Sequence, residues 1–137
     1  MFDEIPVNVG LSRMRRIFFV RGARIDATEG PLELTFENGE VRLFGVGSNG
    51  ETLVIDREPW ADPFSGRVSA ENEEFIVESG KWEAFDLGGL WSYGRFIGRC
   101  LTSVERTGDN SLRLAFGELL LDVESAYDEL KVEFPPV

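Results

Sequence analysis

Short runs in which apolar and polar residues alternate recur along this chain, with turn residues between them. In residues 32–36, Leu, Leu and Phe alternate with Glu and Thr, and Asn38-Gly39 follows, a pair that accepts the positive φ angles of a tight hairpin turn. The alternation resumes over 41–43 and returns over 112–123. Because successive side chains of a strand point to opposite faces, each run can bury one face and expose the other. The pattern predicts a mainly β fold of antiparallel hairpins.

The two ends of the chain also resemble each other. Apolar residues of the first half recur about 80 residues later in the same order, across four successive elements. We therefore expect a single domain over 1–137 made of two duplicated antiparallel β-meander halves, residues 11–56 and 90–134, packed as a sandwich or a partly open barrel. Residues 57–89 form a linking hairpin and loop. The clearest matches are Leu32, Leu34, Phe36, Val41 and Leu43 with Leu112, Leu114, Phe116, Leu119 and Leu121.

A stretch with helical spacing precedes each meander. Leu11, Met14 and Phe18 fall at i, i+3 and i+7, and apolar residues of 90–101 follow the same rule. We expect one or two short helices here, with their apolar side chains pointing inward. The fold class is thus mainly β, a β-rich α+β arrangement.

The missing residue types exclude many kinds of chemistry. The chain has no histidine and one cysteine, Cys100, so it lacks the parts of Ser-His-Asp and Cys-His catalysis, of the usual zinc sites and of a disulfide framework. Residues 45–50 have GxGxxG spacing, but no helical pattern follows and Glu51 would repel phosphate. We expect a protein that is not an enzyme and has no cofactor or metal. The alternative is a carboxylate-based hydrolase, for which Asp26 and Glu105, at equivalent repeat positions, are the least arbitrary candidates; exposed strand positions are the simpler interpretation.

The charge of the chain indicates the kind of partner it favours. The net charge is -11, and the residues after 24 carry 9 basic against 23 acidic side chains. This excess opposes nucleic-acid binding and favours cationic partners, although solubility alone also explains an acidic surface. The basic stretch 13–21 fits either an anionic membrane surface or, as the simpler interpretation, ion pairs with its own domain. The acidic start of the chain is unlike a signal peptide, so we expect a cytoplasmic protein without a membrane partner.

The middle segment holds the most distinctive residues. All three tryptophans, Trp60, Trp82 and Trp91, lie within 32 residues, and Glu71, Glu73 and Glu74 form an acidic cluster between them. Tryptophans that close the core between the two halves are one interpretation, and an aromatic cleft or a protein-binding face is the other. The acidic cluster is either a solvated loop or a docking patch for a basic partner. These six residues are the candidate partner-binding site.

The last third of the chain resembles a group of known proteins. Residues 108–116, Gly-Asp-Asn-Ser-Leu-Arg-Leu-Ala-Phe, and 127–130, Tyr-Asp-Glu-Leu, look like segments of small acidic bacterial proteins of unknown function, some of them immunity-like proteins that neutralise toxins by direct binding. The resemblance implies a binding role and transfers no site residue. The function expected is therefore intracellular binding of a basic protein partner. Binding of a small ligand or sugar in an aromatic cleft is the alternative.

Overall fold

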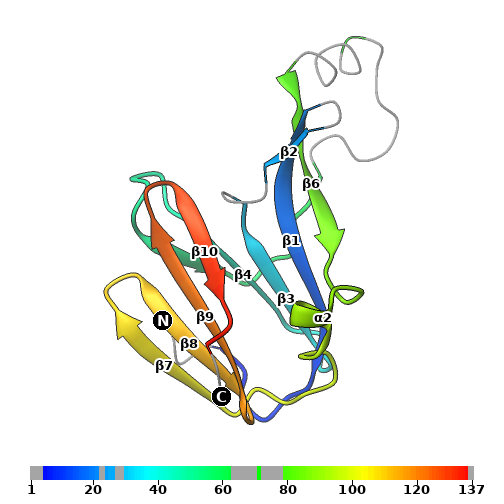
Figure 1. Ribbon diagram of the computed structural model, residues 1–137, viewed down its shortest axis with the longest axis vertical. Coiled ribbons are helices and arrows are strands. Elements are labelled where there is room, and N and C mark those ends of the chain that lie inside the picture. The colour runs from blue at the N-terminus through cyan, green and yellow to red at the C-terminus, as the bar shows by residue number, and fades with distance from the viewer. Residues whose placement is uncertain (1–4, 22–23, 27–29, 63–70, 72–78, 136–137) are drawn as a thin grey trace.

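The computed structural model describes residues 5–21, 24–26, 30–62, 71 and 79–135, and it confirms a mainly β fold (Figure 1). Its strands form two antiparallel sheets, and no closed barrel is present in this part of the chain. The elements are β1 (Leu11–Arg21), β2 (Arg24–Asp26), β3 (Leu32–Phe36), β4 (Val41–Val46), β5 (Leu53–Asp56), β6 (Lys81–Asp86), α2 (Trp91–Gly94), β7 (Ser103–Gly108), β8 (Ser111–Phe116), β9 (Leu119–Ala126) and β10 (Glu129–Glu133).

The first sheet is organised around the long strand β1. On one edge of β1, strand β3 pairs with its first half and β2 with its second half, while β6 pairs with the other edge. Strands β3, β4 and β5 continue outward as a meander. The segment that carries β6 thus returns to the start of the chain, which places residues about 65 positions apart side by side.

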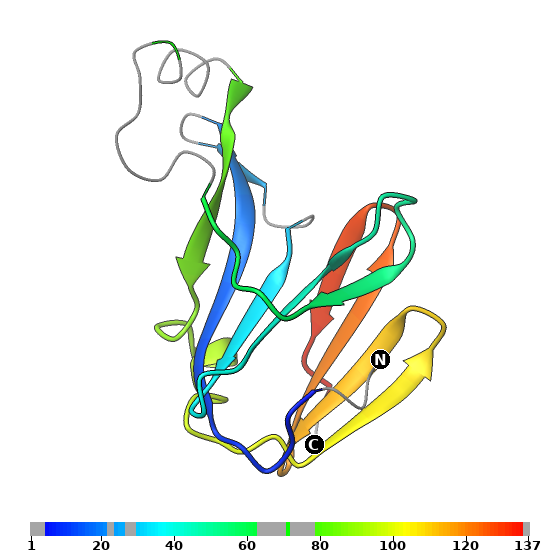
Figure 2. The same cartoon turned by 180° about the vertical axis from the view of Figure 1, so that it is seen from behind.

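The second sheet is an uninterrupted meander in the order β10-β9-β8-β7. Figure 2 shows from behind that β1, β2 and β6 diverge from the second sheet toward one end, whereas the turn after β4 stays beside the turn after β9. The apolar faces of β3 and β8 meet in the core, and the side chains at the matched positions of these two strands are all buried. These are Leu32, Leu34, Phe36, Leu112, Leu114 and Phe116.

The expected helix at 11–18 is wrong, because these residues form β1. The pairing with β3 has an irregularity between Leu11 and Arg13, which inserts one residue into the alternation. Leu11 and Met14 are therefore both buried although they stand three residues apart, and this mimics helical spacing. The following Ile17, Phe18, Phe19 and Val20 are β-branched or aromatic and favour a strand.

The expected helix in the second half is present but short. Tyr93 lies in α2, which has four residues, and hydrogen-bonded turns continue to Arg99. None of the helices in the described residues is long and apolar enough to cross a membrane. Each half contains a three-stranded meander, β3–β5 and β8–β10, and their origin by duplication stays a prediction. The hairpin expected within 57–89 is described only in part: β6 is present, and residues 72–78 before it lie outside the described residues.

Candidate binding cleft

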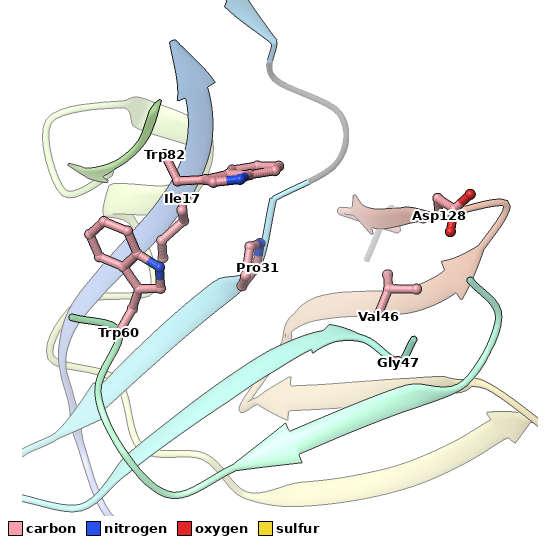
Figure 3. Close-up of a pocket in the computed structure, with 7 residues that line it drawn as sticks. All are labelled: Ile17, Pro31, Val46, Gly47, Trp60, Trp82 and Asp128. Atoms are coloured by element: carbon pink, nitrogen blue, oxygen red, sulfur yellow. The ribbon is translucent and has the colours of Figure 1, made fainter. Parts of the chain in front are cut away.

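Two of the three tryptophans line one open cleft with a volume of about 330 Å³ (Figure 3). Trp60 and Trp82 flank Ile17 of β1 on one wall, and Pro31, which precedes β3, lies beside them. The opposite wall is formed by Val46 and Gly47 at the end of β4 and by Asp128 in the turn between β9 and β10. The cleft therefore combines apolar and aromatic surface with one carboxylate.

Strand pairing positions Trp82. The register of β6 against β1 sets Trp82 beside Phe19, and the two rings lie edge to face with centroids 5.3 Å apart. Ile17 lies two residues before Phe19 and therefore on the same face of the sheet. That face is the one opposite the core, so Trp82 covers Ile17 while 36% of its own surface stays exposed. The pairing of β6 with β1 and the contact of the two rings thus hold an accessible indole.

A buried carboxylate positions Trp60. The Trp60 main-chain N–H donates to Oε2 of Glu33 at 2.8 Å, and its carbonyl accepts from Nη2 of Arg15 at 3.3 Å. Arg15 also donates to both oxygens of Glu33, at 2.7 Å each, and Arg13 lies 3.5 Å from Oε1. The Glu33 side chain is fully buried under these groups. The segment after β5 is therefore fastened to the outer face of β1 and β3.

The charges of this network reinforce one another. Burial raises the pKa of Glu33, but the hydrogen bonds from Arg15 and from the Trp60 N–H lower it by more, so the pKa lies below its ordinary value of 4.5. The bond to Glu33 in turn raises the pKa of Arg15. Two parallel N–H···O bonds between a guanidinium and a carboxylate fix the relative orientation of both groups. Glu33 therefore stays ionised at neutral pH and acts as an anchor.

A second ion pair connects the two tryptophan-bearing segments. Nζ of Lys81, the residue before Trp82, lies 2.9 Å from Oδ2 of Asp62, two residues after Trp60. The hydrogen bond to Asp62 raises the pKa of Lys81. This pair brings the loop after β5 and the start of β6 together at the cleft.

The opposite wall has an unusual backbone. Tyr127 and Asp128 both have positive φ, 53° and 62°, in the tight turn where Asn-Gly is the favoured pair. The Asp128 N–H donates to the Gly50 carbonyl at 2.8 Å, and a Cβ at Gly50 would lie 2.3 Å from Oδ1 of Asp128. The turns after β4 and β9 are thereby packed together. Tyr127 is 85% exposed, so the turn holds a large ring in a strained conformation without burying it.

The structure unites only part of the site expected from the sequence. Trp60 and Trp82 meet in the cleft, and neither belongs to the hydrophobic core, so a core-closing role is wrong for both. Trp91 lies in α2, but its side chain is outside the described residues. Glu71 is exposed, and Glu73 and Glu74 are outside the described residues.

Sequence reasoning missed the residues that complete the cleft. No sequence feature distinguishes Ile17 and Pro31 from other apolar residues, and nothing in the sequence places Asp128 near either tryptophan. A usable signal existed in the turn, because Tyr127-Asp128 separates two alternating runs without a glycine. Such a turn costs conformational free energy, which makes it a candidate for function.

The other candidates take structural positions. Glu105 is exposed on β7, and Asp26 lies on β2 of the other sheet with its side chain outside the described residues. Arg13 and Arg15 of the basic stretch form ion pairs with their own domain at Glu33, as the simpler interpretation expected. Within the described ranges, no group of three or more Cys, Asp or Glu side chains is placed to hold a metal ion. Comparison with family models, curated proteins and solved structures finds no match for this chain.

Proposed function

We propose that this is a non-enzymatic binding protein that engages a basic protein partner through the cleft between Trp60, Trp82 and Asp128. The observation that supports it is the composition of the two walls, with two indoles on one wall and a carboxylate on the other. A lysine or arginine side chain that enters the cleft would lie against an indole face and near a negative charge. Such contacts are worth about 0.5–2 kcal/mol each, depending on how much water is removed.

The charge of the whole chain supports the same partner. A net charge of -11 attracts a basic protein over a distance and speeds association at low salt. Tryptophan and tyrosine are common energetic centres of interfaces, and the exposed Tyr127 precedes Asp128 in the turn. The resemblance to immunity-like proteins favours a basic toxin, met in the cytoplasm, as the partner.

Sugar binding is the second candidate, and the open cleft favours it. Tryptophan-lined clefts with few polar groups suit small ligands, and this cleft has one carboxylate on its lining. The two proposals differ in salt dependence. Binding of a neutral sugar is indifferent to ionic strength, whereas binding of a basic partner weakens as salt rises.

A titration with a lysine-rich peptide, followed by tryptophan fluorescence at low and high salt, tests the proposal. We expect saturable binding at low salt and weaker binding at high salt. The affinity for the peptide should fall at least tenfold in Trp82→Ala and several-fold in Asp128→Asn. Glu105→Gln is the matched control, because it removes one exposed carboxylate from β7 and leaves the cleft intact. Equal affinity in Trp82→Ala and wild type would overturn the proposal.

A pull-down from native lysate at two salt concentrations tests the same site with a natural partner. We expect a basic protein at low salt that Trp82→Ala fails to retain. Replacing Glu71, Glu73 and Glu74 by lysine shows whether the acidic cluster contributes. Retention by Trp82→Ala, together with loss in the lysine variant, would move the interface from the cleft to the cluster.

A further inference from the structure

Arg16 is a buried cation without a carboxylate partner. It lies on the core side of β1, and only 3% of its surface is exposed. Its Nε donates to the Gly30 carbonyl at 2.9 Å, its Nη2 donates to the Leu130 carbonyl, and the Tyr93 hydroxyl lies close to the guanidinium. In the described part of the chain, no acidic side chain forms an ion pair with it. Its neighbour Arg15, on the opposite face, has Glu33 instead.

Two neutral carbonyls engage Nε and Nη2 of Arg16, and its guanidinium also lies over the Phe18 ring, 5.7 Å from the ring centroid. Arginine has five N–H donors, and a buried charge is costly unless an opposite charge or several hydrogen bonds compensate it. Burial lowers the pKa of Arg16, with Tyr93 opposing the change. Among the described residues, Nη1 of Arg16 donates no hydrogen bond and no carboxylate pairs with the charge.

Arg16 lines an open cavity of about 270 Å³. Arg16 and Leu130 are its most buried lining residues and so form its inner wall, with Tyr93 beside them. Strand β10 forms another wall, and it is an edge strand of the second sheet. Because the Leu130 carbonyl points to Arg16 and away from β9, the N–H groups of Leu130 and Val132 point the same way. The cavity therefore brings a guanidinium, a hydroxyl and main-chain donors together.

We propose that this cavity binds the carboxylate of a small organic acid or of a peptide C-terminus, with the carboxylate oxygens on the Arg16 guanidinium. A planar guanidinium and a carboxylate match in geometry and charge. Glu129, Lys131 and Glu133 also line the cavity, so β10 contributes two negative charges and one positive charge. Phosphate fits less well, because this negative excess repels a dianion more than a monoanion. The site is independent of the tryptophan cleft, since Arg16 and Ile17 lie on opposite faces of β1.

A nuclear magnetic resonance titration with benzoate tests this site. The readouts are the Nε–H resonance of Arg16 and the amide resonances of Leu130 and Val132. We expect saturable shifts with benzoate, and none with benzamide, its neutral counterpart, or with inorganic phosphate. Absence of saturable shifts, or equal shifts with benzamide, would show that the cavity does not select a carboxylate. A tripeptide with a free C-terminus, compared with its C-terminal amide, distinguishes a peptide from a small acid as the source.

Two variants assign the binding to named groups. Arg16→Lys keeps the charge but loses the forked donors, and we expect its affinity for benzoate to be at least tenfold weaker. Tyr93→Phe removes the hydroxyl, and we expect its affinity for benzoate to be several-fold weaker. Arg113→Lys, on the outer face of the second sheet, is the matched control and leaves affinity unchanged. Unchanged affinity in Tyr93→Phe and Arg16→Lys would overturn the assignment. If Arg16→Lys does not fold, Tyr93→Phe and the benzamide comparison still decide it.

Discussion

The two meanders use the same alternating pattern, but the charged residues on their outer faces differ in how far solvent reaches them. Glu33 lies between Leu32 and Leu34 of β3, and Arg113 occupies the same position between Leu112 and Leu114 of β8. The Glu33 side chain is fully buried, whereas that of Arg113 is 36% exposed and pairs with Asp122 at 2.8 Å. The difference arises because the segment after β5 covers the outer face of β3. A local pattern thus specifies which face a residue takes, and a distant segment decides whether that face meets water.

The inner faces differ as well. The register pairs Leu34 with Arg42 in the first meander and Leu114 with Leu121 in the second. The structural counterpart of Leu121 is therefore Arg42, not Leu43 as the sequence match suggested. Arg42 is buried, and its guanidinium donates to the Val41 carbonyl and to Glu40. The first meander thus holds charge on both of its faces, while the core face of the second is apolar at these positions.

The largest expected effect tests whether the two meanders contribute equally to the core. Phe36 and Phe116 are both 1% exposed, and replacing either one by alanine removes a large ring from the same cluster. We expect each variant to lose about 4 kcal/mol of unfolding free energy, measured by urea denaturation. A much smaller loss in one of them would show that its half packs less tightly.

The next effect separates the two outer faces. Glu33→Gln removes the charge that holds Arg15 and weakens the acceptor of the Trp60 N–H, and we expect a loss of about 3 kcal/mol. Arg113→Gln breaks an exposed pair, and we expect a far smaller shift of the urea midpoint. Similar losses in the two variants would contradict the covering role of the segment after β5.

The pH dependence of stability sharpens the same contrast. The pKa of Glu33 is lower in the folded chain than its ordinary value of 4.5, so its contribution is fully present above that value and is lost as pH falls through the lower, folded value. We expect the stability difference between wild type and Glu33→Gln to shrink as pH is lowered through this range. Urea melts of both proteins across this range measure it. A difference that stays constant with pH would mean that the Glu33 charge is not responsible.

The smallest effect concerns the paired turns of the two halves. The turn after β4 has Gly50 at φ 75°, whereas the turn after β9 has Tyr127 at φ 53°. Asparagine accepts this conformation more readily than tyrosine, so we expect Tyr127→Asn to stabilise the fold by about 0.5–1 kcal/mol. Thermal denaturation measures the gain. Greater stability together with weaker binding of the lysine-rich peptide would show that Tyr127 is retained for recognition.

Much of the architecture follows from local pattern. The alternation over 32–36 and 111–116 and the Asn38-Gly39 turn predict the strands and hairpins that the structure contains. Strand β1 was missed because one inserted residue after Leu11 changes the period of its apolar positions from two to three. The spacing of apolar residues predicts a regular strand correctly. It fails where an irregular pairing changes which residues face the core.

The sequence by itself determined the β class and the buried positions of β3 and β8. Only the tertiary structure decided that Trp60 and Trp82 lie outside the core and line one cleft with Asp128, and that Glu33 and Arg16 are buried. These outcomes depend on pairings between segments far apart in the chain, such as β6 with β1 and the segment after β5 with Glu33. Burial and electrostatic environment are properties of what packs on a residue, and local sequence does not contain that information.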